Sequence, residues 1–216
     1  TGWNGLAIGA LSEAGVLLGE SAYLDAALRC AELMVGSHLV DGRLRRASRG
    51  GVVGAALGVA DDHGNLAEGL LVLHQATGEA LWLDAARSLL DTALSRFGTA
   101  SGTEGEAGEA GAAGAFHDTA DDAEVLFARP HGSGDNAEPS GQSAIAGALL
   151  MLGALSGEPR YLSAADPAID TATWVDITPS AGPGASPSAR LASRASASTS
   201  RASSRKISRI SSSCAI

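Results

Sequence analysis

The 216-residue sequence has few aromatic side chains and only two cysteines, and both shortages limit what the chain can be. Phe, Trp and Tyr make up 4% of the residues whereas 45% are hydrophobic, so a core must be built mainly from Ala, Leu and Val. Cys30 and Cys214 lie far apart without a CxxC pair, which excludes a disulfide-rich scaffold, a thiol-redox pair and a cysteine zinc site. A reducing cytoplasm is therefore the expected compartment.

Long apolar runs and nucleotide-binding motifs are also absent. No apolar run approaches the roughly 20 residues that cross a bilayer, and no basic start followed by a short apolar stretch suggests a signal peptide, so we expect no membrane insertion. The sequence lacks a Walker loop and a G-x-G-x-x-G motif, so nucleotide-dependent catalysis has no support and no cofactor is expected. The start at Thr1 rather than Met fits a processed or partial chain.

Negative charge is concentrated in the first part of the chain. Residues 1–165 hold 21 Asp and Glu against 9 Arg, whereas residues 166–216 hold 3 Asp against 5 Arg and Lys206. Because an acidic body repels phosphate, nucleic-acid binding by residues 1–165 is disfavoured.

Apolar residues recur at helical spacing in five stretches. These span residues 3–18, 23–34, 66–73, 82–97 and 144–152. Gly19 separates the first two, which predicts an antiparallel helical hairpin with Cys30 in its core. In the first stretch the apolar face that should be buried begins at Trp3 and ends at Leu18. Nothing in residues 1–165 alternates convincingly with a period of two, so no strands are expected.

A ten-residue pattern recurs at three joints, LGESAYLDAA at 18–27, TGEALWLDAA at 77–86 and SGEPRYLSAA at 156–165. In each, the Gly is expected to close one helix in the left-handed conformation, and the aromatic residue (Tyr23, Trp82 or Tyr161) to pack at the start of the next. Unequal spacing favours helical hairpins separated by variable loops. We therefore predict an all-α fold, a partial (α/α)6 toroid of three hairpins over residues 1–165.

Two segments have no helical pattern. Residues 98–140 include GEAGEAGAAG at 105–114, which is too short and too poor in proline for a collagen helix, so a flexible loop insertion is expected. Residues 166–216 are rich in Ser, Ala, Arg and Pro, which predicts a disordered tail. Two explanations of this tail stay open: an Arg/Ser segment that binds RNA or is phosphorylated, and a meaningless end such as a frameshifted one.

Four motifs in consistent order resemble a known family. They are WNGLAIGAL at 3–11, DDHGNLAEGLL at 61–71, GAFHDTADDAEVLFARP at 114–130 and DNAEPSGQS at 135–143. Together they resemble the C-terminal part of the thioredoxin domain-containing proteins related to spermatogenesis-associated protein 20. The resemblance implies an (α/α)6 barrel of the six-hairpin glycosidase type, similar to the N-acylglucosamine 2-epimerases. It also implies a thioredoxin-like domain of the same protein as a partner; that domain is not in this sequence, so no redox activity carries over.

The resemblance, together with polar residues at helix starts, indicates a carbohydrate-related function: sugar binding, epimerisation or hydrolysis. The candidate catalytic residues are Asp61, Asp62, His63 and Glu68. A carboxylate would act as acid or base on a sugar, and His63 would shuttle a proton. The alternative for Asp61 and Asp62 is helix capping, and for Glu68 it is a solvated helix face. His63 departs from the family, which usually has an aromatic residue after the paired aspartates.

One aromatic and five polar residues are further candidates for substrate binding: Trp3, Asn4, Asp118, Asn136, Ser140 and Gln142. Gln142 stands where the family usually has Asn. The Trp3 ring would stack on a sugar or, alternatively, pack in the core; Ser140 is equally interpreted as a helix N-cap. No metal site is expected, because His117 stands beside carboxylates without paired-ligand spacing. The alternative to a carbohydrate site is a non-catalytic helical scaffold that presents a protein-binding surface.

Overall fold

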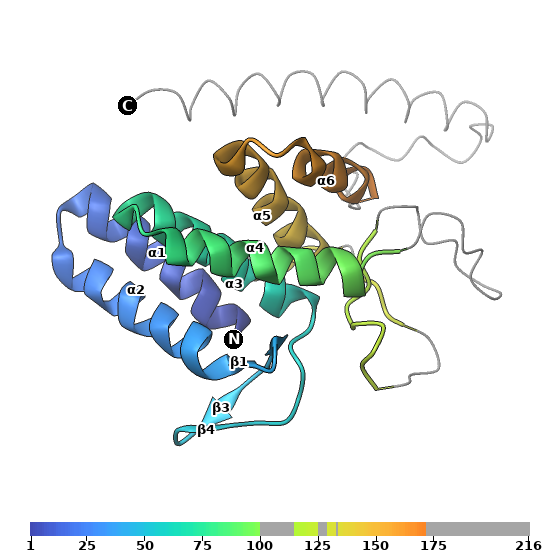
Figure 1. The fold of residues 1–216 in the computed structure, drawn as a ribbon, viewed down its shortest axis with the longest axis horizontal. Helices are drawn as coiled ribbons and strands as arrows, with labels where there is room; N and C mark the ends of the chain where they lie inside the picture. The colour runs from blue at the N-terminus through green and yellow to red at the C-terminus, as the bar shows by residue number, and fades with distance from the viewer. Residues whose placement is uncertain (100–114, 125–128, 133, 172–216) are drawn as a thin grey trace, which may run out of the picture. The chain divides into compact units, whose positions relative to one another are not determined.

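The computed structural model describes residues 1–99, 115–124, 129–132 and 134–171, and these are mostly helical (Figure 1). The α-helices are α1 (Gly2–Leu18), α2 (Ser21–Leu33), α3 (Ala60–Thr77), α4 (Ala80–Arg96), α5 (Gly141–Ser156) and α6 (Pro159–Thr171). A short π-helix, η1 (Met34–His38), follows α2. The prediction of a mainly helical chain is confirmed.

Between η1 and α3 the chain forms four strands that the sequence did not predict. They are β1 (Leu39–Val40), β2 (Arg43–Leu44), β3 (Ser48–Arg49) and β4 (Val52–Val53). β1 pairs with β2 and β3 with β4, both antiparallel. A strand of two residues is too short to show alternation, which is why its signal was missed.

Three helical hairpins are confirmed, each closed by the predicted glycine. They are closed by Gly19, Gly78 and Gly157, with φ of 69°, 74° and 72°. The N–H of each glycine donates to the carbonyl four residues earlier in the preceding helix. Trp82 and Tyr161 are buried as expected, but Tyr23 is 42% exposed. The prediction of a packed aromatic side chain is therefore wrong for the first joint.

The first helix of each hairpin lies in one row, and the second helix covers it. α3 packs against α1 on one side and α5 on the other, whereas α2, α4 and α6 each pack against the helix before them (Figure 1). The buried core between the helices includes Leu66 and Leu70 of α3, Leu90 of α4, and Ile145 and Leu149 of α5. This row brings the first turns of α3 and α5 next to each other.

Glycines let the backbone of α3 touch both of its neighbours. A Cβ added at Gly69 would lie 2.2 Å from the carbonyl oxygen of Gly5, and one added at Gly5 would lie 2.5 Å from the backbone of Asn65. On the α5 side, a Cβ at Gly64 would lie 2.6 Å from the Cβ of Ala144. These distances are far below van der Waals contact, so only glycine fits at the crossings.

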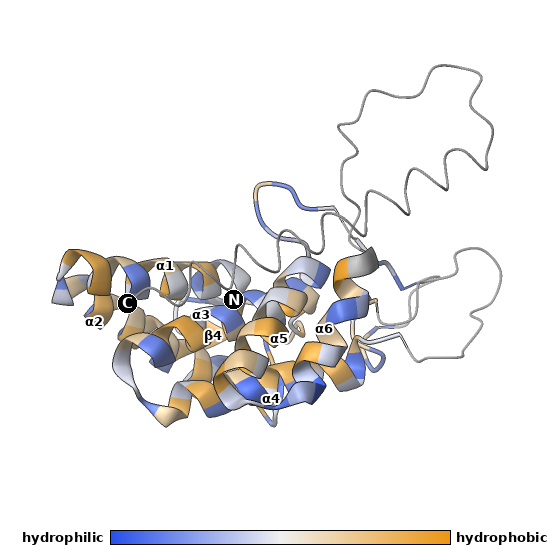
Figure 2. Cartoon of the chain, turned by 90° about the horizontal axis from the view of Figure 1, so that it is seen from above, coloured by the Kyte–Doolittle hydropathy of each residue, from blue (hydrophilic) through white to orange (hydrophobic). Residues whose placement is uncertain are grey.

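The buried face of α1 differs from the predicted one. Trp3 is 78% exposed and Leu17 is 75% exposed, so the interpretation of Trp3 as a core residue is wrong. The buried residues are Gly2, Gly5, Ile8, Ser12 and Gly15. Close packing on α3 places the small residues of α1 inside and its large hydrophobic residues outside. In Figure 2, orange marks the hydrophobic residues of the α1–α2 hairpin. Cys30, expected in the core, is partly buried.

Helix α6 extends past the predicted end of the domain. It continues to Thr171 with Pro167 inside it, so the expected boundary after Ala165 falls within a helix. Residues 172–216 and the glycine-rich insertion at 105–114 lie outside the described residues, so the predictions made for them stay predictions. Within the described ranges, no helix has the length and hydrophobicity that a membrane crossing requires.

Candidate functional site

A groove of about 330 Å³ lies where α3 and α5 begin. Its lining includes Asp61, Asp118, Asn136, Glu138 and Ser140. All of these except Glu138 are residues that the sequence analysis selected, and they come from three separate segments. The volume is near the lower end of the roughly 300–1,000 Å³ of known ligand sites, which suits a small molecule.

Asp118 holds the loop side of the groove in place. Its backbone N–H donates to the carbonyl of Pro130 (2.8 Å), and its backbone carbonyl accepts from Ala60 at the start of α3 (2.9 Å). Its two carboxylate oxygens accept from the N–H of Gly132 at 3.0 and 3.2 Å. Asp118 therefore joins residues 130–132 to the first turn of α3, while its side chain stays at the groove.

The start of α5 forms another wall. Ser140 is the N-cap, and its Oγ accepts from the N–H of Ser143 at 3.2 Å, which confirms the capping interpretation. Asp135 Oδ1 accepts from the N–H of Ser140 at 3.0 Å, and this hydrogen bond lowers the pKa of Asp135. Asn136 is exposed, and its backbone N–H donates to the carbonyl of Glu138.

Asp61 is the groove carboxyl with the most unusual electrostatics. Its pKa is raised, first by burial and then by the neighbouring carboxylate of Asp62. Arg46, whose Nη1 lies 3.7 Å from Asp61 Oδ1, acts in the opposite direction. A carboxyl group that keeps its proton to higher pH and lines a groove is suited to general acid and base chemistry.

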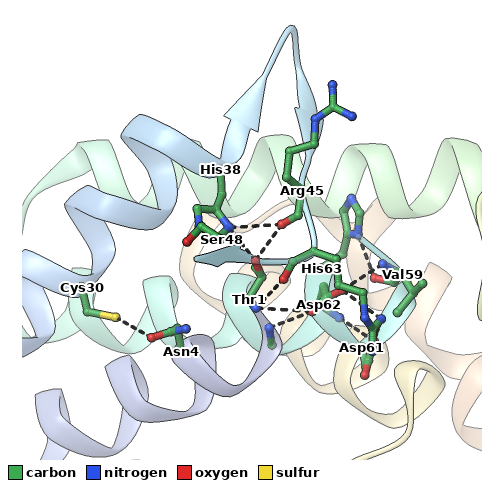
Figure 3. A network of polar contacts seen from close by, with 12 residues as sticks. Thr1, Asn4, Cys30, His38, Arg45, Ser48, Val59, Asp61, Asp62 and His63 are labelled. Carbon is green, nitrogen blue, oxygen red and sulfur yellow. Dashed lines mark hydrogen bonds and ion pairs between the residues drawn. The ribbon is translucent and has the colours of Figure 1, made fainter. Parts of the chain in front are cut away.

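Asp62 has a structural role beneath the groove (Figure 3). It is 3% exposed. Its Oδ1 accepts from the N–H of Gly2 at 2.8 Å, and its Oδ2 accepts from the N–H of Val59 at 3.0 Å and from Arg46 Nη1 at 3.2 Å. The capping interpretation is confirmed for Asp62, which ties the start of α1 to the start of α3. It does not line the groove.

His63 also lies inside the fold. Its Nδ1 is 3.0 Å from the carbonyl oxygen of Val59, and its ring centroid is 4.8 Å from that of Phe97. Because a carbonyl oxygen only accepts, Nδ1 carries the hydrogen. Burial lowers the pKa of His63, so the ring is held neutral among apolar neighbours. The groove lining does not include it.

Gln142 and Glu68 are placed away from the groove lining. Gln142 is buried; its Oε1 accepts from the N–H of Phe116 at 3.2 Å and its Nε2 donates to the carbonyl of Ala168 at 2.8 Å. It links the loop after α4 to α6. Glu68 lies nearly two turns after Asp61 on α3, and a Cβ added at Gly147 of α5 would lie 3.9 Å from its Oε2.

Trp3 and Asn4 lie on α1 and do not line the groove either. The thiol of Cys30 contacts Asn4 Oδ1 at 3.3 Å, which links α2 to α1. The structure therefore gathers Asp61, Asp118, Asn136 and Ser140 and separates them from the other candidates. Among the described residues, no group of three or more His, Cys, Asp and Glu side chains is arranged to hold a metal ion.

Sequence reasoning missed three residues of this region: Arg46, Asn65 and Glu138. Asn65 follows Asp61 by one turn of α3 and is 1% exposed, and neither polar atom of its side chain has a hydrogen-bond partner. A polar residue inside the apolar run of α3 was the available signal. Arg46 and Glu138 come from irregular segments whose path the sequence does not reveal.

Comparison with known proteins gives two similar mammalian proteins. The chain is 29% identical to human spermatogenesis-associated protein 20 over 170 residues, which cover 74% of this chain and 20% of the relative. It is 31% identical to rat spermatogenesis-associated protein 20 over 170 residues, which again cover 74% of this chain and 20% of the relative. No protein-family model matches the chain. The chain thus has distant homology to these proteins and spans about a fifth of their length.

The raised pKa of Asp61 makes stability depend on pH. The folded state binds this proton more tightly than the unfolded chain, so the contribution of Asp61 to stability falls as pH rises from the ordinary Asp value through the raised one. Asp61→Asn, which has no charge, should raise the melting temperature at neutral pH. The gain should vanish at about pH 3, where Asp61 is protonated in both states. Thermal denaturation against pH measures it, and a pH-independent difference would contradict the raised pKa.

Proposed function

We propose that this domain binds a small carbohydrate in the groove at the start of α3 and α5, and that Asp61 is its acid or base. The supporting observation is the Asp61 carboxyl, which has a raised pKa and lines a groove of ligand size with other polar groups. We also propose that the three hairpins are half of an (α/α)6 toroid. The row of α1, α3 and α5, covered by α2, α4 and α6, supports this arrangement.

The polar groups of the groove suit sugar hydroxyls. The carboxylates of Asp61, Asp118 and Glu138 are acceptors, and the Asn136 amide both donates and accepts. In hydrolysis a protonated Asp61 would give its proton to the glycosidic oxygen as its bond to the sugar breaks, while a second carboxyl of the groove would take a proton from the water that attacks the sugar carbon. In epimerisation an ionised Asp61 would remove a proton from carbon. Both reactions use a carboxyl whose pKa lies above the ordinary value.

Ligand-induced heat stabilisation tests the proposal. A panel of neutral mono- and disaccharides is added to the chain, and the melting temperature and the heat of titration are measured. We expect at least one sugar to raise the melting temperature, and we expect Asp61→Asn to reduce its affinity about tenfold or more, since a hydrogen bond to a charged group contributes about 1.5–3 kcal/mol.

The matched control is Asp84→Asn, which changes an exposed carboxylate of α4 that does not line the groove. Its sugar affinity should equal that of the unchanged chain. If no sugar changes the melting temperature and titration gives no heat, the proposed function is wrong. Equal loss of affinity in both variants would place the site elsewhere.

A further inference from the structure

A buried histidine outside the groove contacts an exposed serine. His38 ends η1 and is 2% exposed. Its Nδ1 lies 2.8 Å from Thr1 Oγ1 and 3.2 Å from the carbonyl oxygen of Arg45, and its Nε2 lies 2.9 Å from Ser48 Oγ (Figure 3). Both ring nitrogens therefore have hydrogen-bond partners. Of these three partners, only Ser48, in the β3–β4 hairpin, is an exposed residue.

The contacts around Nδ1 fix the tautomer of His38. The Thr1 hydroxyl donates to the carbonyl oxygen of Arg45 at 2.7 Å, so its hydrogen is not available to the ring. The carbonyl oxygen itself only accepts. Nδ1 therefore carries the hydrogen and Nε2 presents its lone pair to Ser48. This is the orientation in which a histidine can take the proton of a serine hydroxyl.

Ser48 is held in place by a tight hairpin. β3 pairs with β4 through a turn at Gly50 and Gly51, with φ of 58° and 79°. The N–H of Gly54 donates to the carbonyl of Ala47 at 2.9 Å. Ser48 is exposed, so a reactant can approach it from solvent, while His38 is buried.

We propose that Ser48 is a nucleophile, activated by His38 as general base, that accepts acyl groups from activated esters. Ser48 Oγ attacks the carbonyl carbon as its proton moves to His38 Nε2. The bond from that carbon to the leaving oxygen then breaks, and the leaving oxygen takes the proton from Nε2. The products of this step are an ester on Ser48 and a free alcohol. Water then attacks the ester carbonyl by the same proton route, which frees Ser48 and releases a carboxylic acid.

Charge near Ser48 indicates the kind of ester. Arg43, Arg45, Arg46 and Arg49 lie within this short stretch, although residues 1–165 as a whole are acidic. Arg43 pairs with Asp122, and Arg46 pairs with Asp61 and Asp62. Within the described residues this leaves Arg45 and Arg49 as the cations of the stretch without an ion pair. Arg49 is exposed beside Ser48, and its side chain has no hydrogen bond or ion pair within the described residues. A positive patch attracts anions, so the preferred acyl donor should carry a negative charge.

A tagged fluorophosphonate tests the nucleophile on the full chain. Ser48 Oγ would bond to phosphorus as fluoride leaves and the proton passes to His38. We expect mass spectrometry to find the label on Ser48, and labelling to be lost in Ser48→Ala. The matched control is Ser37→Ala, because Ser37 is exposed next to His38 in sequence but has no hydrogen bond to it. An unlabelled Ser48, or equal labelling of Ser37, would overturn the proposal.

A second pair of variants tests the base without removing the buried His38. In Ser48→Cys and Ser37→Cys, the alkylation rate by iodoacetamide is followed at each position by mass spectrometry at neutral pH. We expect position 48 to react about 10²-fold faster, the lower range of general-base catalysis. Equal rates would overturn the role of His38.

The ester class is tested with nitrophenyl acetate and nitrophenyl hydrogen succinate. We expect nitrophenol to be released faster from the succinate than from the acetate. This difference should be lost in Ser48→Ala and reduced by salt. Equal rates would overturn the preference for an anion. Because neither Ser48 nor His38 lines the groove, these outcomes are independent of sugar binding.

Discussion

One methyl group added at Gly69 is expected to destabilise the domain by about 3 kcal/mol, at the upper end of the usual cost of overpacking. The new Cβ of Gly69→Ala would lie 2.2 Å from the backbone oxygen of Gly5. Because that atom belongs to a helix backbone, α1 and α3 would have to move apart. Urea denaturation followed by far-UV circular dichroism measures the loss.

The control for this substitution is Gly36→Ala in η1. A Cβ at Gly36 would meet nothing within 4 Å, and the position is exposed. Alanine favours helical backbone over glycine by up to about 1 kcal/mol, so the stability of this variant should be unchanged or slightly higher. If Gly69→Ala unfolded at the same urea concentration as the control, the close contact of α1 and α3 would be contradicted.

The second large effect is expected at Asp62. Asp62→Ala removes the acceptor of the Gly2 and Val59 N–H groups and the partner of Arg46. A buried N–H group left without its acceptor costs about 1–3 kcal/mol, whereas the lost ion pair adds little because the Arg46 side chain is 48% exposed. Asp62→Asn keeps one acceptor oxygen, so we expect a smaller loss from it. Thermal and urea denaturation of the two variants measure the difference.

Asp61→Asn is the matched control for Asp62, since the two residues are adjacent in the first turn of α3. Asp61 lines the groove, and within the described residues the only backbone N–H that its carboxylate accepts from is that of Asp62. Its substitution should leave folding intact and change ligand binding, whereas Asp62 substitution should change folding. Equal destabilisation by Asp61→Asn and Asp62→Ala would contradict this division between site and support.

The hairpins were predictable because their signals are local. A helix, a glycine in the left-handed conformation and the next helix occupy a few successive residues, and Gly19, Gly78 and Gly157 show the pattern directly. The face of α1 was not predictable from hydropathy. Its orientation depends on the approach of Gly5 to α3, which is about sixty residues away in sequence, and this contact places Trp3 and Leu17 outside.

The site was predictable in its residue types and only partly in its membership. Polar residues at the starts of α3 and α5 indicated Asp61 and Ser140 as neighbours of a cleft, and packing of the two helices brings them together. Asp62, His63 and Gln142 are also polar but face inward: Asp62 caps α3, His63 packs on Phe97, and Gln142 links two segments. Helix phase at a first turn is set by such contacts, which a single sequence does not reveal.

The glycine crossings have a consequence for how this sequence can change over time. At Gly5, Gly64 and Gly69 every substitution adds atoms, since no amino acid is smaller than glycine. A buried leucine can drift to isoleucine or methionine at modest cost, but these positions have no conservative replacement. These three glycines, which have no side chain to bury, should therefore be among the slowest-changing positions of the domain. Divergent copies of this fold should keep them even after much of the apolar core has been replaced.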